Sequence, residues 1–284
     1  MGTLFDAETS RPGRWLQYAL FMGLLVLGFM VGLTQAAWAT PVLTGSVQAL
    51  AGDAGPQVLN DTGVQVAAVG PLTVSTSAAQ GGASAGGTMT ANYGVITGSA
   101  GAFFSGTNPG GGAGVFAFGR WEDIFTVGSS TLAPGTAVTL SGLLTLDLSE
   151  TAVGATSGSA AAFVSVTDQG AYTNGTVVGF LNPSQVGTFS LSAPVSINTF
   201  VGDNLDISGQ LQLAPSINGI GSMTLDASHT SIFTLASATS GADFTTLSGA
   251  SYAPQASAAP EPSTLLFLGS GLVGLVAWRW KRAA

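Results

Sequence analysis

Cysteine is absent from the chain, and histidine occurs once, as His229. The lack of cysteine excludes disulfide frameworks, cysteine nucleophiles and Cys/His zinc sites. His229 follows Asp226 and Ser228 closely, but a Ser-His-Asp triad needs side chains that converge from separate elements. We therefore interpret His229 as a turn or strand-end residue, and we predict neither a cofactor nor a metal site.

Charged residues are almost as scarce, at 7% of the chain against about 25% in ordinary soluble domains. Between Thr40 and Ala259 the only basic residue is Arg120, which stands against eleven acidic ones. One cation cannot neutralise a phosphate backbone, so we expect no nucleic-acid partner. Gly, Ala, Ser and Thr replace the missing charges, and this composition suits strands joined by tight turns.

The N-terminus has the features of a signal peptide. Arg11 and Arg14 precede a charge-free apolar run, and Ala37-Trp38-Ala39 fits the small-x-small cleavage pattern. We predict that residues 1–39 are removed, with Ala37 and Ala39 at the cleavage site. An uncleaved signal anchor is the alternative, and it exports the same middle segment.

The C-terminus carries three features in a fixed order. Pro260-Glu261-Pro262 comes first, and the two prolines force an extended backbone that a processing enzyme can grip. An apolar stretch follows and predicts a transmembrane helix at about residues 264–280. The stretch ends in an anchor and basic tail formed by Trp278, Arg279, Trp280, Lys281 and Arg282.

This three-part pattern resembles the PEP-CTERM sorting signal of Gram-negative bacteria. The resemblance implies that an exosortase-type membrane enzyme processes the chain near Pro260, Glu261 and Pro262. It also implies transient residence in the inner membrane, then delivery to the cell envelope, the cell surface or the extracellular space. Family members occur in bacteria that make extracellular polysaccharide, which is therefore an implied partner. An unprocessed tail anchor is the alternative.

The middle of the chain alternates between apolar and polar residues, as half-buried antiparallel strands do. One apolar series contains Val138, Leu140, Leu144, Leu146 and Leu148, and a second contains Leu205, Ile207, Leu211 and Leu213. Short segments such as Trp121-Glu122-Asp123 and residues 246–252 are similar to segments of exported PEP-CTERM proteins of β-sandwich type. We predict an all-β, antiparallel two-sheet sandwich, jelly-roll-like, over residues 40–252. A linker (253–259) and the sorting signal (260–284) follow it.

Several local features are predicted from glycine. Asn174-Gly175 and Asn218-Gly219 are dipeptides typical of hairpin turns. The glycine-rich runs 78–87 and 106–114 indicate mobile loops. Gly142 and Gly209 interrupt the two apolar series and suggest a bulge or bend in each strand.

No motif predicts a reaction, so we expect a non-enzymatic structural or interaction protein. A carbohydrate-binding module is the first alternative, with Trp121 as the possible sugar contact; the competing role for Trp121 is in the core. A secreted glycan hydrolase is the second, and three carboxylate pairs are candidates for it: Glu122/Asp123, Asp147/Glu150 and Asp203/Asp206. Asp203, Asn204 and Asp206 are also possible calcium ligands, although no EF-hand spacing is present.

Overall fold

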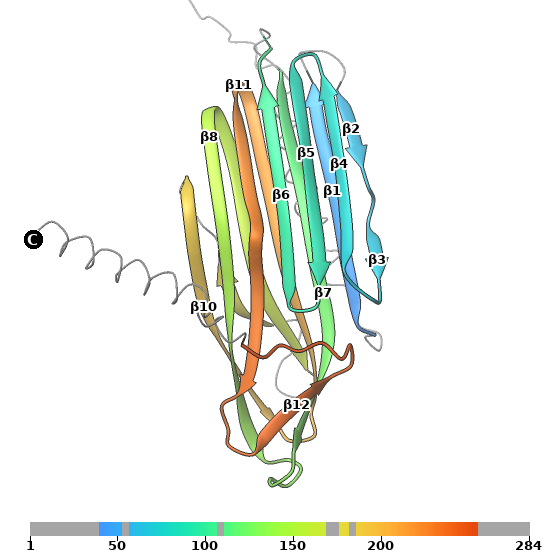
Figure 1. Cartoon of the computed structure of the whole chain (residues 1–284), viewed down its shortest axis with the longest axis vertical. Coiled ribbons are helices and arrows are strands. Elements are labelled where there is room, and N and C mark those ends of the chain that lie inside the picture. The colour runs from blue at the N-terminus through green and yellow to red at the C-terminus, as the bar shows by residue number, and fades with distance from the viewer. Residues whose placement is uncertain (1–39, 53–56, 107–110, 169–175, 182–185, 255–284) are drawn as a thin grey trace, which may run out of the picture. The chain divides into compact units, whose positions relative to one another are not determined.

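The structure is a computed structural model that describes residues 40–52, 57–106, 111–168, 176–181 and 186–254 (Figure 1). The chain divides into two compact units, 1–252 and 253–284. The predicted signal peptide, most of the linker and the predicted transmembrane helix lie outside the described residues. Within the described residues, no helix is long and apolar enough to cross a membrane.

Twelve strands form the fold, and they occupy most of the described chain. Their bounds are β1 Val42–Gly52, β2 Val58–Asp61, β3 Gln65–Ala67, β4 Leu72–Gln80, β5 Ala83–Asn92, β6 Val95–Phe104, β7 Gly112–Ser129, β8 Ala137–Asp168, β9 Thr176–Leu181, β10 Gly187–Phe200, β11 Asn204–Ser237 and β12 Ala242–Thr246.

The strands belong to one continuous antiparallel sheet that is folded into two layers (Figure 1). The first layer contains β2, β3, β1, β7, the first half of β11, the second half of β8, and β9. The second contains β4, β5, β6, the second half of β11, the first half of β8, and β10. Strands β1 and β7 contact β4 and β5 without pairing with them, so the layers pack face to face. The all-β class and the two-layer sandwich are confirmed, although the two layers are not the separate sheets of a jelly roll.

Two long strands make the fold possible, because β8 and β11 each pass from one layer into the other. The passage in β8 lies at Gly154, whose φ is 84°, and the passage in β11 lies near Gly219, whose φ is 111°. A Cβ on Gly154 would stand 2.2 Å from the carbonyl oxygen of Ile220, so only glycine fits this crossing. The hairpin predicted at Asn218-Gly219 is therefore wrong. β11 pairs with β8 on both sides of this dipeptide, so the chain bends there without reversing.

The core lies between the layers and contains the predicted apolar faces. All nine residues of the two apolar series are buried, and Leu211 is fully inaccessible. Leu143, on the opposite face of β8, is 40% exposed. Alternation places every second side chain between the layers, so these predicted strand faces are confirmed.

Other glycine-based predictions need correction. Residues 78–87 form the end of β4, a two-glycine turn and the start of β5, so this run is a hairpin. Gly142 and Gly209 keep their strands in register, so neither marks a bulge. Gly209 instead leaves room for a neighbour, since a Cβ there would lie 2.5 Å from the Trp121 indole. The predicted turn at 174–175 lies outside the described residues.

Candidate functional site

The segment that follows β11 closes one end of the sandwich, at the lower end of Figure 1. β12 pairs with the last residues of β7 in the first layer. Beyond β12, the Leu247 amide donates to the carbonyl of Ile124 at 2.9 Å. The amide of Leu235, in the second layer, donates to the carbonyl of Tyr252 at 2.7 Å. Residues 242–252 therefore join the two layers, and we call them the closing segment.

Asp123 holds the closing segment from inside the core. Its carboxylate is inaccessible to solvent and accepts hydrogen bonds from the amides of Ile124 (2.9 Å) and Ser248 (3.0 Å). The hydroxyls of Ser248 and Tyr252 also donate to it, the latter at 3.1 Å. A buried charge is costly unless it is hydrogen-bonded, and four donors meet this requirement here. The arrangement suits a structural clamp.

Aromatic rings surround the clamp. The ring of Tyr252 lies 4.7 Å from that of Phe125 and 5.3 Å from that of Trp121, and Trp121 also stacks on Phe233 at 5.6 Å. Burial, together with the negative charge of Asp123, raises the pKa of Tyr252, so the phenol stays protonated and donates. The ring of Tyr252 and its hydroxyl thus both fix the closing segment to the core.

The structure places Trp121 in the core, with 1% of its surface exposed. Its indole packs among aromatic rings and above Gly209, so it has no free face on which a sugar can stack. The prediction of Trp121 as a ligand contact is corrected for this reason. β7 turns its odd-numbered residues inward, and Trp121 shares that face with Asp123 and Phe125.

A second polar cluster occupies the opposite face of β7. Arg120 pairs with Glu122 at 2.5 Å, and Glu122 is hydrogen-bonded to Asp206 on β11. Burial and the neighbouring negative charge of Glu122 raise the pKa of Asp206 to about 7. Asp206 is therefore partly protonated near neutral pH, and the nearby guanidinium of Arg120 opposes this shift.

The structure separates all three predicted carboxylate pairs. Asp147 and Glu150 lie three residues apart on β8 and so point to opposite faces. Glu122 and Asp123 are adjacent on β7 and so point to opposite faces. Asp203 accepts bonds from the Thr199 hydroxyl and the Phe200 amide in a turn, away from the Glu122–Asp206 pair. Glycoside hydrolysis needs about 5–9.5 Å between its two carboxyls, a wider gap than direct hydrogen bonding allows. The pair that does form therefore lacks the spacing of a hydrolase site.

The proposed calcium ligands do not converge either. The oxygen of Asn204 accepts a bond from the Thr126 hydroxyl at 2.7 Å, and Asp203 serves its own turn. Asp206 lies in the cluster with Glu122. Among the described residues, no group of three His, Cys, Asp or Glu side chains is placed to hold a metal ion.

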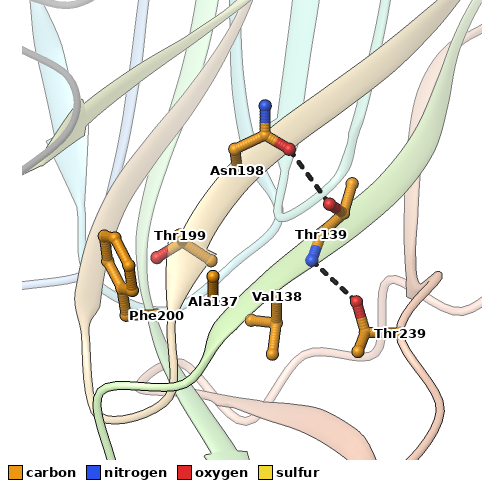
Figure 2. Close-up of a pocket in the computed structure, with 7 residues that line it drawn as sticks. All are labelled: Ala137, Val138, Thr139, Asn198, Thr199, Phe200 and Thr239. Atoms are coloured by element: carbon orange, nitrogen blue, oxygen red, sulfur yellow. Dashed lines mark hydrogen bonds between the residues drawn. The ribbon is translucent and has the colours of Figure 1, made fainter.

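A shallow hollow of about 300 Å³ lies where β8 and β10 meet (Figure 2). Thr139 is part of its lining. The hydroxyl of Thr139 donates to Asn198 at 3.0 Å, and its amide donates to the Thr239 hydroxyl at 2.9 Å. Phe200 contributes an aromatic ring that is 46% exposed. The full lining is Ala137, Val138, Thr139, Asn198, Thr199, Phe200 and Thr239. Hydroxyls, an amide and an aromatic ring without any charge suit a neutral, polyhydroxylated ligand.

The remaining predicted site residues lie outside the described part of the chain. They are Ala37 and Ala39 at the signal cleavage site, the processing motif Pro260, Glu261 and Pro262, and the anchor and tail residues Trp278, Arg279, Trp280, Lys281 and Arg282. The comparison with protein families bears on the C-terminal group. Residues 258–282 match the family model of the PEP-CTERM protein-sorting motif. The chain carries a PEP-CTERM sorting signal.

This PEP-CTERM signal implies processing by exosortase, a membrane enzyme, and export through the membrane to the cell envelope or surface. The match covers the C-terminal signal and leaves the β-sandwich outside it. Neither a curated protein nor a solved structure matches the chain. The signal therefore indicates the route of the protein and leaves the role of the β-sandwich open.

Sequence reasoning missed two functional groupings. Ser248 and Tyr252 lie 125 and 129 residues from Asp123, and only the strand pairing brings them to its carboxylate. The signal that the sequence offers is an aspartate at an alternating position between two aromatic residues, Trp121 and Phe125. A carboxylate buried with them must find hydrogen-bond donors. The hollow beside Phe200 had no signal, because its residues come from separate strands.

Proposed function

We propose that this PEP-CTERM protein is a non-enzymatic structural or interaction protein of the cell envelope or extracellular matrix. The sorting signal carries the proposal, because it sends a compact sandwich to the outside of the cell. The buried polar groups on the two faces of β7 support it. Asp123 uses its acceptors to hold the closing segment, and Glu122 is engaged by Arg120 and Asp206.

The test of the proposed route replaces Pro260, Glu261 and Pro262 with alanine in the native host. Processing should stop while export and folding continue, because the apolar stretch still anchors the chain. The unprocessed form should accumulate in the inner membrane, heavier by about 2–3 kDa, which corresponds to a span of about 20 residues. Membrane fractionation and mass spectrometry of the mature C-terminus provide the measurement.

The matched control changes three flanking residues, Gln255, Ser257 and Ser263, to alanine and keeps the motif. This variant should be processed like the wild type. Wild-type protein that retains Trp278 to Ala284 at its final location would show an ordinary tail anchor and overturn the proposal. Turnover of a polysaccharide by the purified protein would overturn its non-enzymatic part.

The hollow beside Phe200 favours a second candidate, a module that binds the extracellular polysaccharide. An exposed ring next to hydroxyl and amide groups is a common way to hold a neutral ligand. Phe200→Ala should weaken binding to polysaccharide purified from the host by roughly tenfold, which corresponds to about 1.4 kcal/mol. Phe103, which is 48% exposed and distant in the sheet, is the matched control. Equal binding by both variants would exclude this hollow as the site.

A further inference from the structure

The edge of the second layer at β4 is open. Among the described residues, β4 pairs with β5 alone, and it lies beside β2 and β3 on the right-hand side of Figure 1. The side chains of Thr73, Ser75, Ser77 and Ala79 are exposed on one face of β4. The unpaired edge of a strand presents a row of backbone N–H and C=O groups, and this row is a template for another strand.

One contact shows which backbone groups face outward. The side-chain amide of Asn60, on β2, donates to the carbonyl of Ser77 at 2.5 Å. In an antiparallel pair, alternate residues direct both backbone groups to the same side, so those of Thr73 and Ser75 also point away from β5. Asn60 engages one carbonyl, that of Ser77, and leaves the other outward-facing backbone groups between Thr73 and Ser77 for an additional strand.

Strand β4 itself contains none of the usual protection against pairing, and the nearest proline, Pro71, lies just before its first residue. Proteins block exposed edges with charges, prolines or bulges. No charged residue or histidine occurs from Thr62 to Gly119, a range that includes all of β3, β4, β5 and β6. The opposite edge of the same layer is different. Strand β10 contains Pro194 and lies beside Asp147 and Glu150 on β8.

Exposed aliphatic side chains flank the open edge. They lie on β2, on β3 and in the chain between these strands and β4, and their exposed fractions are Leu59 55%, Val64 54%, Val66 63% and Val69 84%. Strands β2 and β3 both contact β4. A strand that pairs with β4 would therefore also cover apolar surface, which contributes to association.

We propose that β4 pairs antiparallel with β4 of a second copy and forms a two-fold symmetric dimer. The full chain carries a net charge of −8, so two copies repel each other least where charge is absent. The uncharged segment from Thr73 to Ser77 is compatible with itself across a two-fold axis at Ser75. The proline and the acidic residues at β10 stop growth at the other edge, so the assembly closes at two copies. This inference is independent of the proposed route and of the hollow.

The test introduces a charge at the open edge of the full chain purified from the native host. Ser75→Lys should convert a dimer to a monomer of half the mass, measured by light scattering after size exclusion across a dilution series. Thr88→Lys is the matched control, because Thr88 is exposed on β5 directly opposite Ser75 but lies away from the edge. It should stay dimeric. Circular dichroism confirms that both variants keep the β fold.

A cross-linking experiment checks the register without relying on that variant. The chain has no cysteine, so Ser75→Cys introduces a single thiol. A short bis-maleimide should link two copies through it and link Thr88→Cys far less. A wild type that is monomeric throughout the dilution series, a folded Ser75→Lys variant that stays dimeric, or equal cross-linking at both positions would overturn the dimer proposal.

Discussion

Asp123 shows how a single residue organises one end of this protein. Its carboxylate collects donors from β7 and from the closing segment, and it lies against a cluster of four aromatic rings. Hydrogen bonds to a buried charge are stronger than those between neutral groups, and each lost acceptor leaves a buried donor unpaired. The residue is therefore a structural centre.

Asp123→Ala should lower the free energy of unfolding by about 3 kcal/mol or more, because it leaves the Ser248 and Tyr252 donors without an acceptor. Tyr252→Phe removes one of those donors and should cost about 1–2 kcal/mol. Urea denaturation measures both values. Thr245→Ala, at an exposed position of β12, is the control and should stay within about 0.5 kcal/mol of the wild type. An equally mild Asp123→Ala would mean that the clamp contributes little.

Asp206 predicts a pH dependence of stability. Its pKa is raised to about 7 in the folded protein, so the folded state holds a proton that the unfolded chain releases near pH 4. The contribution of this proton to the free energy of unfolding is complete below about pH 4 and is lost as the pH rises through about 7. Asp206→Asn should remove this slope and should be more stable than the wild type at pH 8. The expected difference is on the order of 1–2 kcal/mol, because solvent screens a partly exposed group.

Thermal unfolding of the wild type and of Asp206→Asn at intervals between pH 4 and pH 8 gives the measurement. Burial also raises the pKa of Glu150. Both proteins contain Glu150, so the difference between their stability curves reports on Asp206 alone. Parallel curves for the two proteins would contradict the raised pKa of Asp206.

At the scale of the strand, alternation decides which residues matter for folding. Leu144 and Leu211 lie between the layers, while Asp147 and Gln212 lie on outward faces. Leu144→Asp and Leu211→Asp should each unfold the domain or prevent secretion, because a buried unpaired carboxylate is strongly disfavoured. Asp147→Asn and Gln212→Ala should change stability by less than about 0.5 kcal/mol. Secreted yield and denaturation curves test this, and equal tolerance of both sets would mean that the faces are reversed.

The crossing of β8 between the layers depends on a glycine. Gly154 and Gly135 both have a positive φ, 84° and 80°, but open space surrounds Gly135. Gly135→Ala should lower the free energy of unfolding by about 1 kcal/mol, because alanine disfavours a positive φ. Alanine at Gly154 also meets the carbonyl of Ile220 and should cost at least about 2 kcal/mol more. Similar losses for Gly135→Ala and Gly154→Ala in chemical denaturation would mean that the crossing rearranges freely.

At the scale of the whole molecule, the closing segment lies between the last long strand and the sorting signal. Its hydrogen bonds reach both layers, so the fold is complete at Tyr252, a few residues before the processing motif. A chain that ends at Pro254 keeps every one of these contacts. A chain that ends at Thr246 loses the Ser248 and Tyr252 partners of Asp123.

The two truncations should therefore behave differently. The chain ending at Pro254 should fold and unfold in a single cooperative transition. The chain ending at Thr246 should be less stable by several kcal/mol, because a buried carboxylate loses its donors and Trp121 loses an aromatic neighbour. Circular dichroism during heating compares them. Equal melting temperatures would show that the closing segment is dispensable.

Local pattern in the sequence determined the inward faces of the strands and the sorting signal. Strand side chains alternate with a period of two, so a run such as Val138 to Leu148 reveals its buried face without knowledge of its neighbours. The Pro-Glu-Pro motif, the apolar stretch and the basic tail are contiguous, so they can also be read directly from the chain. The scarcity of charge and the absence of cysteine excluded several site classes in the same way.

Only the tertiary structure decided which distant residues meet. Asp123 meets Ser248 and Tyr252, and Glu122 meets Asp206, because strand pairing sets their register across long sequence separations. The dipeptide Asn218-Gly219 predicts a hairpin from local sequence, but the same dipeptide forms a turn or a bend according to which strands pair on either side of it. The sequence leaves Trp121 a role in the core or at a ligand, and the aromatic rings packed around it decide for the core. Burial and pairing depend on the whole sheet, so no local pattern contains them.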